Sequence, residues 1–146
     1  METYEVLTLV VATASLVTSV ATFKVAQAAN RSSKEIAKRQ GVIDLHVQWN
    51  GINDINLSNP VVPDVKNAVN ALSLTASLWN HDVVHKPIIM QSYWDIYRTL
   101  YDKLYIHNDV ITGLGRTGKS MISPDIMKAY REMESYELSR VETSKL

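Results

Sequence analysis

An uncharged run near the N-terminus constrains this chain more than any other feature. From Val6 to Phe23 the sequence reads VLTLVVATASLVTSVATF, with no charge, proline or glycine. A helix that spans a bilayer needs about 17–25 predominantly apolar residues, so the run is near the lower limit. Six of its residues are Thr or Ser, whose hydroxyls can bond back to helix carbonyls and are tolerated in lipid. The run therefore predicts a membrane-spanning helix, with a buried soluble helix as the alternative.

The charges on either side give this helix an expected direction. Glu2 and Glu5 precede the run, whereas a cleaved signal peptide starts with positive charge, although Ala26-Gln27-Ala28 resembles a cleavage site. Five basic residues follow the run, namely Lys24, Arg31, Lys34, Lys38 and Arg39. By the positive-inside rule we expect a single-pass protein of the cell inner (plasma) membrane, with the N-terminus outside and the C-terminal domain in the cytoplasm. A cleaved signal remains the second alternative.

Small residues recur along one face of the same helix. They follow one another at alternating spacings of four and three residues, at Thr8, Ala12, Ser15, Ser19, Thr22, Ala26, Ala29 and Ser33. Such a heptad seam lets two helix backbones approach closely, as membrane helices do when they associate. We therefore expect a homo-oligomer formed through the N-terminal helix, at the positions from Thr8 to Ala26. The abundance of Ala, Ser and Thr in this segment is the simpler explanation of the pattern.

Hydrophobic periodicity predicts further helices in the rest of the chain. Apolar positions at helical spacing cover 64–79 and 87–105, each with a proline near its start. Ser123-Pro124-Asp125 is a helix N-terminal signal with a capping serine, a first-turn proline and an acid. Residues 42–50, VIDLHVQWN, fit a strand or a helix, and the helical segments on both sides favour a helix. Mixed charge and fading periodicity predict a frayed tail over 137–146.

These segments together predict an all-α fold. The N-terminal single transmembrane helix and its juxtamembrane continuation occupy 1–40, a small three- or four-helix cytosolic bundle occupies 41–136, and the tail follows. The 15 basic residues are balanced by 15 acidic ones, which argues against a nucleic-acid partner. The chain has no cysteine, so thiolate zinc sites and cysteine nucleophiles are excluded.

One stretch matches a phosphate-binding pattern at every position. Residues 113–120, GLGRTGKS, fit G-x-x-x-x-G-K-[ST], in which Gly113, Gly118, Lys119 and Ser120 would hold phosphates and magnesium. The pattern also needs a buried strand before it and a long helix after it. Here only Val110-Ile111 precedes the loop, and Pro124 arrives five residues after Lys119. A flexible connection between helices is therefore the favoured interpretation, and weak phosphate binding is the alternative.

His81 and His85 are the other pattern with a chemical meaning. Two histidines four residues apart can bind one metal ion from a helix, but no third ligand is evident and Lys86-Pro87 follows at once. We expect His85 to lie at a helix end, where its charge is favourable with the helix dipole. The sequence therefore predicts no metal site, no cofactor and no catalytic residues.

Four segments after the uncharged run carry a resemblance: VAQAANRSSKEIAKRQ, VIDLHVQWN, NAVNALSLTASLWNHDVV and QSYWDIYRTLYD. In layout the chain resembles a group of small bacterial and phage proteins in which an N-terminal membrane helix leads into a compact helical domain of unassigned function. The resemblance implies a bacterial or phage origin and supplies no catalytic residues. We expect a membrane-anchored, self-associating interaction or effector protein that is not an enzyme and binds an unknown protein partner. The alternative is a nucleotide- or phosphate-responsive protein that uses the 113–120 loop.

Overall fold

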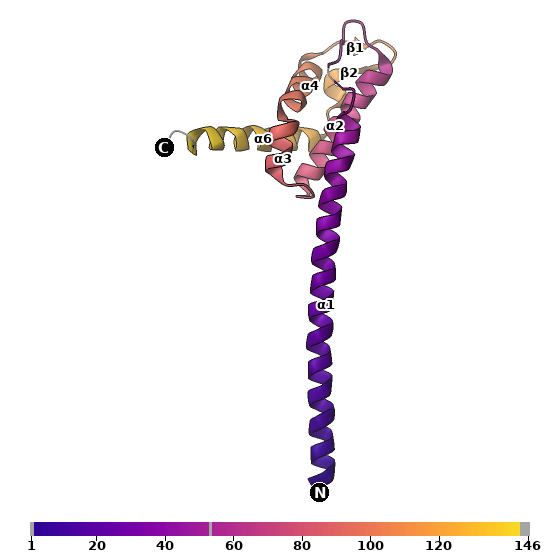
Figure 1. The fold of residues 1–146 in the computed structure, drawn as a ribbon. Coiled ribbons are helices and arrows are strands. Elements are labelled where there is room, and N and C mark those ends of the chain that lie inside the picture. Colours follow the sequence, from indigo (N-terminus) through magenta and orange to yellow (C-terminus); the bar gives the residue numbers. More distant parts are fainter. Residues whose placement is uncertain (1, 53, 144–146) are drawn as a thin grey trace. The chain divides into compact units, whose positions relative to one another are not determined.

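The fold of the chain is mostly helical. A computed structural model describes the backbone of residues 2–52 and 54–143, and the side-chain surroundings of Tyr4, 18–52 and 54–140. Helices make up 76% of the chain, which confirms the predicted all-α class (Figure 1). The chain divides into two compact units, Met1–Ala37 and Lys38–Leu146.

Helix α1 (Glu2–Trp49) forms the first unit and continues into the second. The predicted helix up to Gln40 is confirmed, and residues 42–49 are helical rather than extended. Every side chain from Thr18 to Ala37 is exposed. Four of the exposed side chains are large and apolar, namely Val20, Phe23, Val25 and Ile36.

The predicted membrane span is not supported. Within the residues that the structure describes, no helix combines the length and the hydropathy needed to cross a bilayer. This finding contradicts the predicted localisation, which was a single-pass protein of the inner membrane with its N-terminus outside and its C-terminal domain in the cytoplasm. Charge is the physical reason in the described part of α1, where Lys24, Arg31, Lys34 and Glu35 recur and would be costly to bury in lipid. The side chains of residues 6–17 lie outside the described residues.

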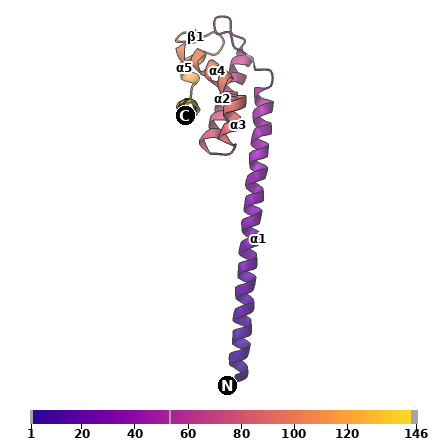
Figure 2. The same ribbon diagram turned by 60° about the vertical axis from the view of Figure 1, so that its left-hand side comes forward.

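The second unit is a helical bundle with one small hairpin. After α1 come α2 (Val62–Asn80), α3 (Lys86–Ser92), α4 (Trp94–Ile106), α5 (Gly118–Met121) and α6 (Pro124–Thr143). Strands β1 (Val110–Ile111) and β2 (Arg116–Thr117) lie between α4 and α5 and pair antiparallel, with Ile111 opposite Arg116. Helix α2 packs against α6, and α4 packs against α3, α5 and α6. Helices α2, α3 and α4 lie side by side (Figure 2).

Aromatic and aliphatic side chains form the core of the second unit. The largest fully buried ones include Trp79, Leu72 and Tyr97. Several polar atoms inside the core pair with one another, as the low dielectric of an interior favours, whereas the buried Trp94 Nε1 has no hydrogen-bond partner. Trp49 Nε1 donates to Thr75 Oγ1 at 2.9 Å, and Thr75 Oγ1 donates to the carbonyl of Ala71 at 2.7 Å. The Tyr97 hydroxyl donates to the carbonyl of Ile126 at 3.0 Å.

The predicted helices of this unit are confirmed, with two differences in their extent. The helix predicted over 87–105 is interrupted at Tyr93, whose φ of −130° and ψ of −10° separate α3 from α4. The tail predicted to fray beyond Tyr136 is helical to Thr143. Tertiary contacts explain its order, because Tyr136 packs edge-on against Trp79 and Glu137 pairs with Arg98 at 3.6 Å.

Candidate functional site

The predicted oligomer seam lies on α1. The side chains of Thr8, Ala12 and Ser15 are outside the described residues, whereas Ser19, Thr22 and Ala26 are described and exposed. Continuing at the same spacing, Ala29 and Ser33 are exposed as well. The term small-residue seam is used below for the five described positions, Ser19, Thr22, Ala26, Ala29 and Ser33.

Apolar side chains flank the small-residue seam on both sides. An α-helix turns by about 100° per residue, so Phe23 and Val25 lie to either side of the line through Thr22 and Ala26. Both side chains are 69% exposed. The heptad spacing next reaches Ile36, which is 65% exposed. The seam is therefore a narrow strip of small residues bordered by larger apolar ones.

The loop that matches the phosphate-binding pattern folds as a tight hairpin. The amides of Leu114 and Gly115 both donate to the carbonyl of Ile111, at 3.0 and 3.3 Å. Gly113 and Gly115 have φ values of 83° and 63°, a region that favours glycine. The glycines therefore serve the turn, and two of the loop amides are used within it.

Lys119 and Ser120 make contacts within the second unit. The Lys119 Nζ lies 5.0 Å from the centroid of the Tyr105 ring, a cation–π contact. Ser120 Oγ donates to the carbonyl of Thr117 at 2.8 Å, and Thr117 Oγ1 accepts from the Ser120 amide as the N-cap of α5. The helix that begins at Gly118 has only four residues. Lys119 and Ser120 therefore already have contacts within the fold. Phosphate binding by them stays a prediction.

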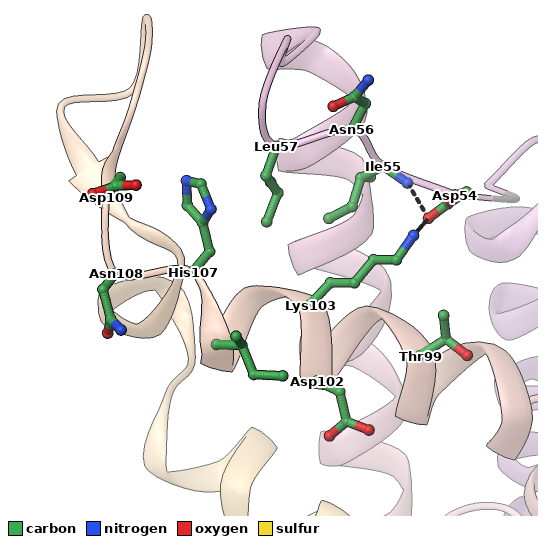
Figure 3. A pocket seen from close by; sticks show the side chains of 11 residues that line it. Asp54, Ile55, Asn56, Leu57, Thr99, Asp102, Lys103, His107, Asn108 and Asp109 are labelled. Atoms are coloured by element: carbon green, nitrogen blue, oxygen red, sulfur yellow. Dashed lines mark hydrogen bonds and ion pairs between the residues drawn. The ribbon is translucent and has the colours of Figure 1, made fainter.

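One cavity of the second unit lies between the loop 54–57, the C-terminal half of α4 and residues 107–109. It has a volume of about 1000 Å³. Figure 3 shows Lys103 reaching from α4 to Asp54, with the amide of Ile55 bound to the same carboxylate. These two hydrogen bonds, that from Lys103 above all, hold the pKa of Asp54 below its usual value. The contact ties the loop to α4 at one end of the cavity.

Among the charged residues that line this cavity, three carboxylates stand against one lysine. Asp102 on α4 accepts a hydrogen bond from the Tyr130 hydroxyl at 3.1 Å. Burial, followed by this hydrogen bond to Asp102, raises the pKa of Tyr130 to about 12. His107 and Asp109 lie at the end of the cavity away from Asp54 (Figure 3). Among the described residues no group of three side chains has metal-ligand geometry.

The two histidines that were considered as metal ligands do not share a helix. His81 is the C-cap of α2 and His85 is the N-cap of α3. Asp82 between them has a φ of 51°, so the chain turns sharply there. The structure therefore places His81 and His85 on either side of a turn.

The sequence did not single out the cavity that Asp54, Asp102 and Lys103 line. Asp54 and Lys103 are 49 residues apart, and neither belongs to a recognisable motif. The contact of Lys103 with Asp54 exists only because the loop packs against α4. No sequence signal would have identified this pair.

Comparison of the chain with protein-family models, curated proteins and solved structures found no match. The resemblance to small bacterial and phage proteins thus stays a prediction. Function has to be argued from the geometry of the chain's own residues.

Proposed function

We propose that this chain is a non-enzymatic interaction protein that self-associates through the small-residue seam of α1. One observation carries the proposal. Every side chain from Thr18 to Ala37 is exposed, among them Phe23, Val25 and Ile36, so a helix of several turns has its apolar groups in water. Most helical stability in proteins comes from packing of an apolar face rather than from intrinsic propensity. A helix laid against this face would supply that packing.

The size of the side chains suits close helix packing. Small residues at the centre of the seam let two backbones approach, and the larger side chains of Phe23 and Val25 cover the gap from both sides. Burying one such large apolar side chain contributes about 1.5–3 kcal/mol. Several of them on each of two helices are sufficient to offset the entropy lost on association.

The distribution of charge favours a second copy of the chain as the partner. Between Thr18 and Ala37 the charged residues are Lys24, Arg31, Lys34 and Glu35, and none occupies a seam position. Counted at 100° per residue, Lys24, Arg31 and Glu35 lie on the face opposite Ala26. Two copies that meet at the seam therefore keep Lys24, Arg31 and Glu35 away from the contact, and Lys34, about 80° from Ala26, lies at its border.

The test is the mass of the full chain in solution, measured by sedimentation equilibrium. The wild type is expected to exceed the 16.4 kDa of one chain. Ala26→Arg places a long cation in the seam and should return the protein to the single-chain mass. Ala28→Arg is the matched control, because it makes the same change about 200° around the helix. It should leave the mass unchanged.

Circular dichroism of both variants checks that α1 stays helical. A wild type with the mass of one chain at all concentrations would refute self-association. Equal dissociation by Ala26→Arg and Ala28→Arg would remove the seam as the contact surface, because charge alone would then explain the effect.

A further inference from the structure

A second cavity lies where the β1–β2 hairpin meets α2. It has a volume of about 400 Å³ and is called the α2–hairpin hollow here. Its lining comes from α2, the hairpin and α5, at Lys66, Val69, Asn70, Gly113, Leu114, Arg116 and Met121. We propose that this hollow binds the phosphate group of a small organic phosphate. The proposal is independent of self-association through α1.

The charge of the hollow is uniformly positive. Lys66 and Arg116 are its two charged lining residues, and no carboxylate lines it. Within the described part of the chain neither cation makes an ion pair, whereas four other cations of the second unit each pair with a carboxylate. A phosphate monoester carries a charge of about −1.5 to −2 at pH 7, which matches two cations. Guanidinium and ammonium groups together are a common phosphate-binding pair.

Local geometry explains why the two cations line one hollow. Lys66 and Asn70 are four residues apart on α2, so they lie on the same helix face. Arg116 is fixed in β2 opposite Ile111. Gly113 allows the hairpin to approach α2, since a Cβ at Gly113 would lie 2.7 Å from Val62 Cγ2. Its φ of 83° also favours glycine.

The rest of the lining suits an organic group. Val69, Leu114 and Met121 are half-buried and present apolar surface next to the polar side chains. Ligand pockets are typically about 300–1,000 Å³ and combine an apolar lining with a few polar groups. The Asn70 amide adds a neutral donor to the two cations. These features favour a phosphate monoester with a compact apolar portion over inorganic phosphate.

This site shares only Gly113 with the residues that the GLGRTGKS pattern assigns to phosphate. That pattern assigns phosphate to Lys119, which lies over the Tyr105 ring and does not line the hollow. Arg116, at an unspecified position of the pattern, lines it instead. Lys119 is therefore a matched control that carries the same charge in the same loop.

The experiment is calorimetric titration of the full chain at low ionic strength with inorganic phosphate and with phenyl phosphate. Both are expected to bind, and phenyl phosphate more tightly. Lys66→Ala and Arg116→Ala should each weaken phenyl phosphate binding about tenfold or more, as expected for loss of a hydrogen bond to a charged group. Lys119→Ala should bind as the wild type does.

Melting temperatures without ligand check that the variants are folded. If either variant is destabilised, an NMR titration of the wild type with phenyl phosphate locates the binding site instead. The amide resonances of residues 113–116 and of Asn70 should then shift. Absence of binding by both probes would refute the proposal. So would loss of binding in Lys119→Ala with retention in Arg116→Ala, because the phosphate would then occupy the pattern residues.

Discussion

Gly118 lies at the start of α5, where an added Cβ would meet the backbone carbonyl oxygen of Leu104 in α4. The backbone of a packed helix cannot move aside as a flexible side chain can. The glycine of the G-K-S sequence is thus required for packing α5 against α4. At the scale of single residues, one added methyl group at Gly118 would prevent α5 from packing against α4.

We expect Gly118→Ala to destabilise the second unit by about 3 kcal/mol, the upper end of the usual cost of overpacking. Gly115→Ala is the control, because Gly115 has a φ of 63° and no neighbour within 4 Å of an added Cβ. Its expected cost is about 1 kcal/mol, from backbone strain alone. Urea unfolding measures both free energies, and equal costs would contradict the packing role of Gly118.

At the scale of elements, one ion pair joins the loop between α1 and α2 to α4. Lys103 on α4 bonds the carboxylate of Asp54, and the amide of Ile55 bonds the same group. Both side chains of the pair are partly exposed, at 61% for Asp54 and 39% for Lys103. Exposed pairs contribute about 0–1 kcal/mol, so the contact positions the loop more than it stabilises the bundle.

This pair predicts a pH dependence of the free energy of unfolding. The pKa of Asp54 is lowered from 3.8 in the folded chain, so its stabilisation is fully present above 3.8 and lost as pH falls through the lowered value. Asp54→Asn should therefore be slightly less stable than the wild type at neutral pH. The difference should vanish in acid. Urea unfolding across this range measures it, and a constant difference would mean that the charge of Asp54 is not responsible.

At the scale of the whole molecule, all core residues among the described side chains belong to the second unit. Its buried hydrophobic residues, among those the structure describes, begin at Leu45 and end at Met133. All three tryptophans, Trp49, Trp79 and Trp94, are in this core. Tryptophan fluorescence therefore reports on the unfolding of the second unit.

We expect a chain that begins at Lys38 to unfold cooperatively, with a free energy within about 1 kcal/mol of the full chain at low protein concentration. At high concentration the full chain should become more stable, because self-association favours the folded state, whereas the shortened chain should not change. Urea titrations at two concentrations measure this. Failure of the shortened chain to fold would show that residues before Lys38 complete its core.

The sequence by itself determined the features that depend on neighbours a few residues apart. Helical periodicity and proline positions identified α2, and Ser123 caps α6 as predicted, since its Oγ accepts from the Ile126 amide at 3.3 Å. The spacing of the seam was also evident from the sequence, although its exposure was not. The membrane prediction rested on the uncharged run of residues 6–23, whereas charged residues recur from Lys24 onward in the described part of α1, and no helix among the described residues is long and apolar enough to span a bilayer.

The tertiary structure alone decided which distant side chains meet. Lys119 contacts Tyr105 instead of projecting freely from its loop, and Lys103 meets Asp54 across 49 residues of chain. Arg116 and Lys66 line one hollow because Gly113 allows the hairpin to reach α2. Helix formation depends on local hydrogen bonds and propensities, which a sequence displays directly. Binding surfaces depend on how whole elements pack, and no local pattern encodes that arrangement.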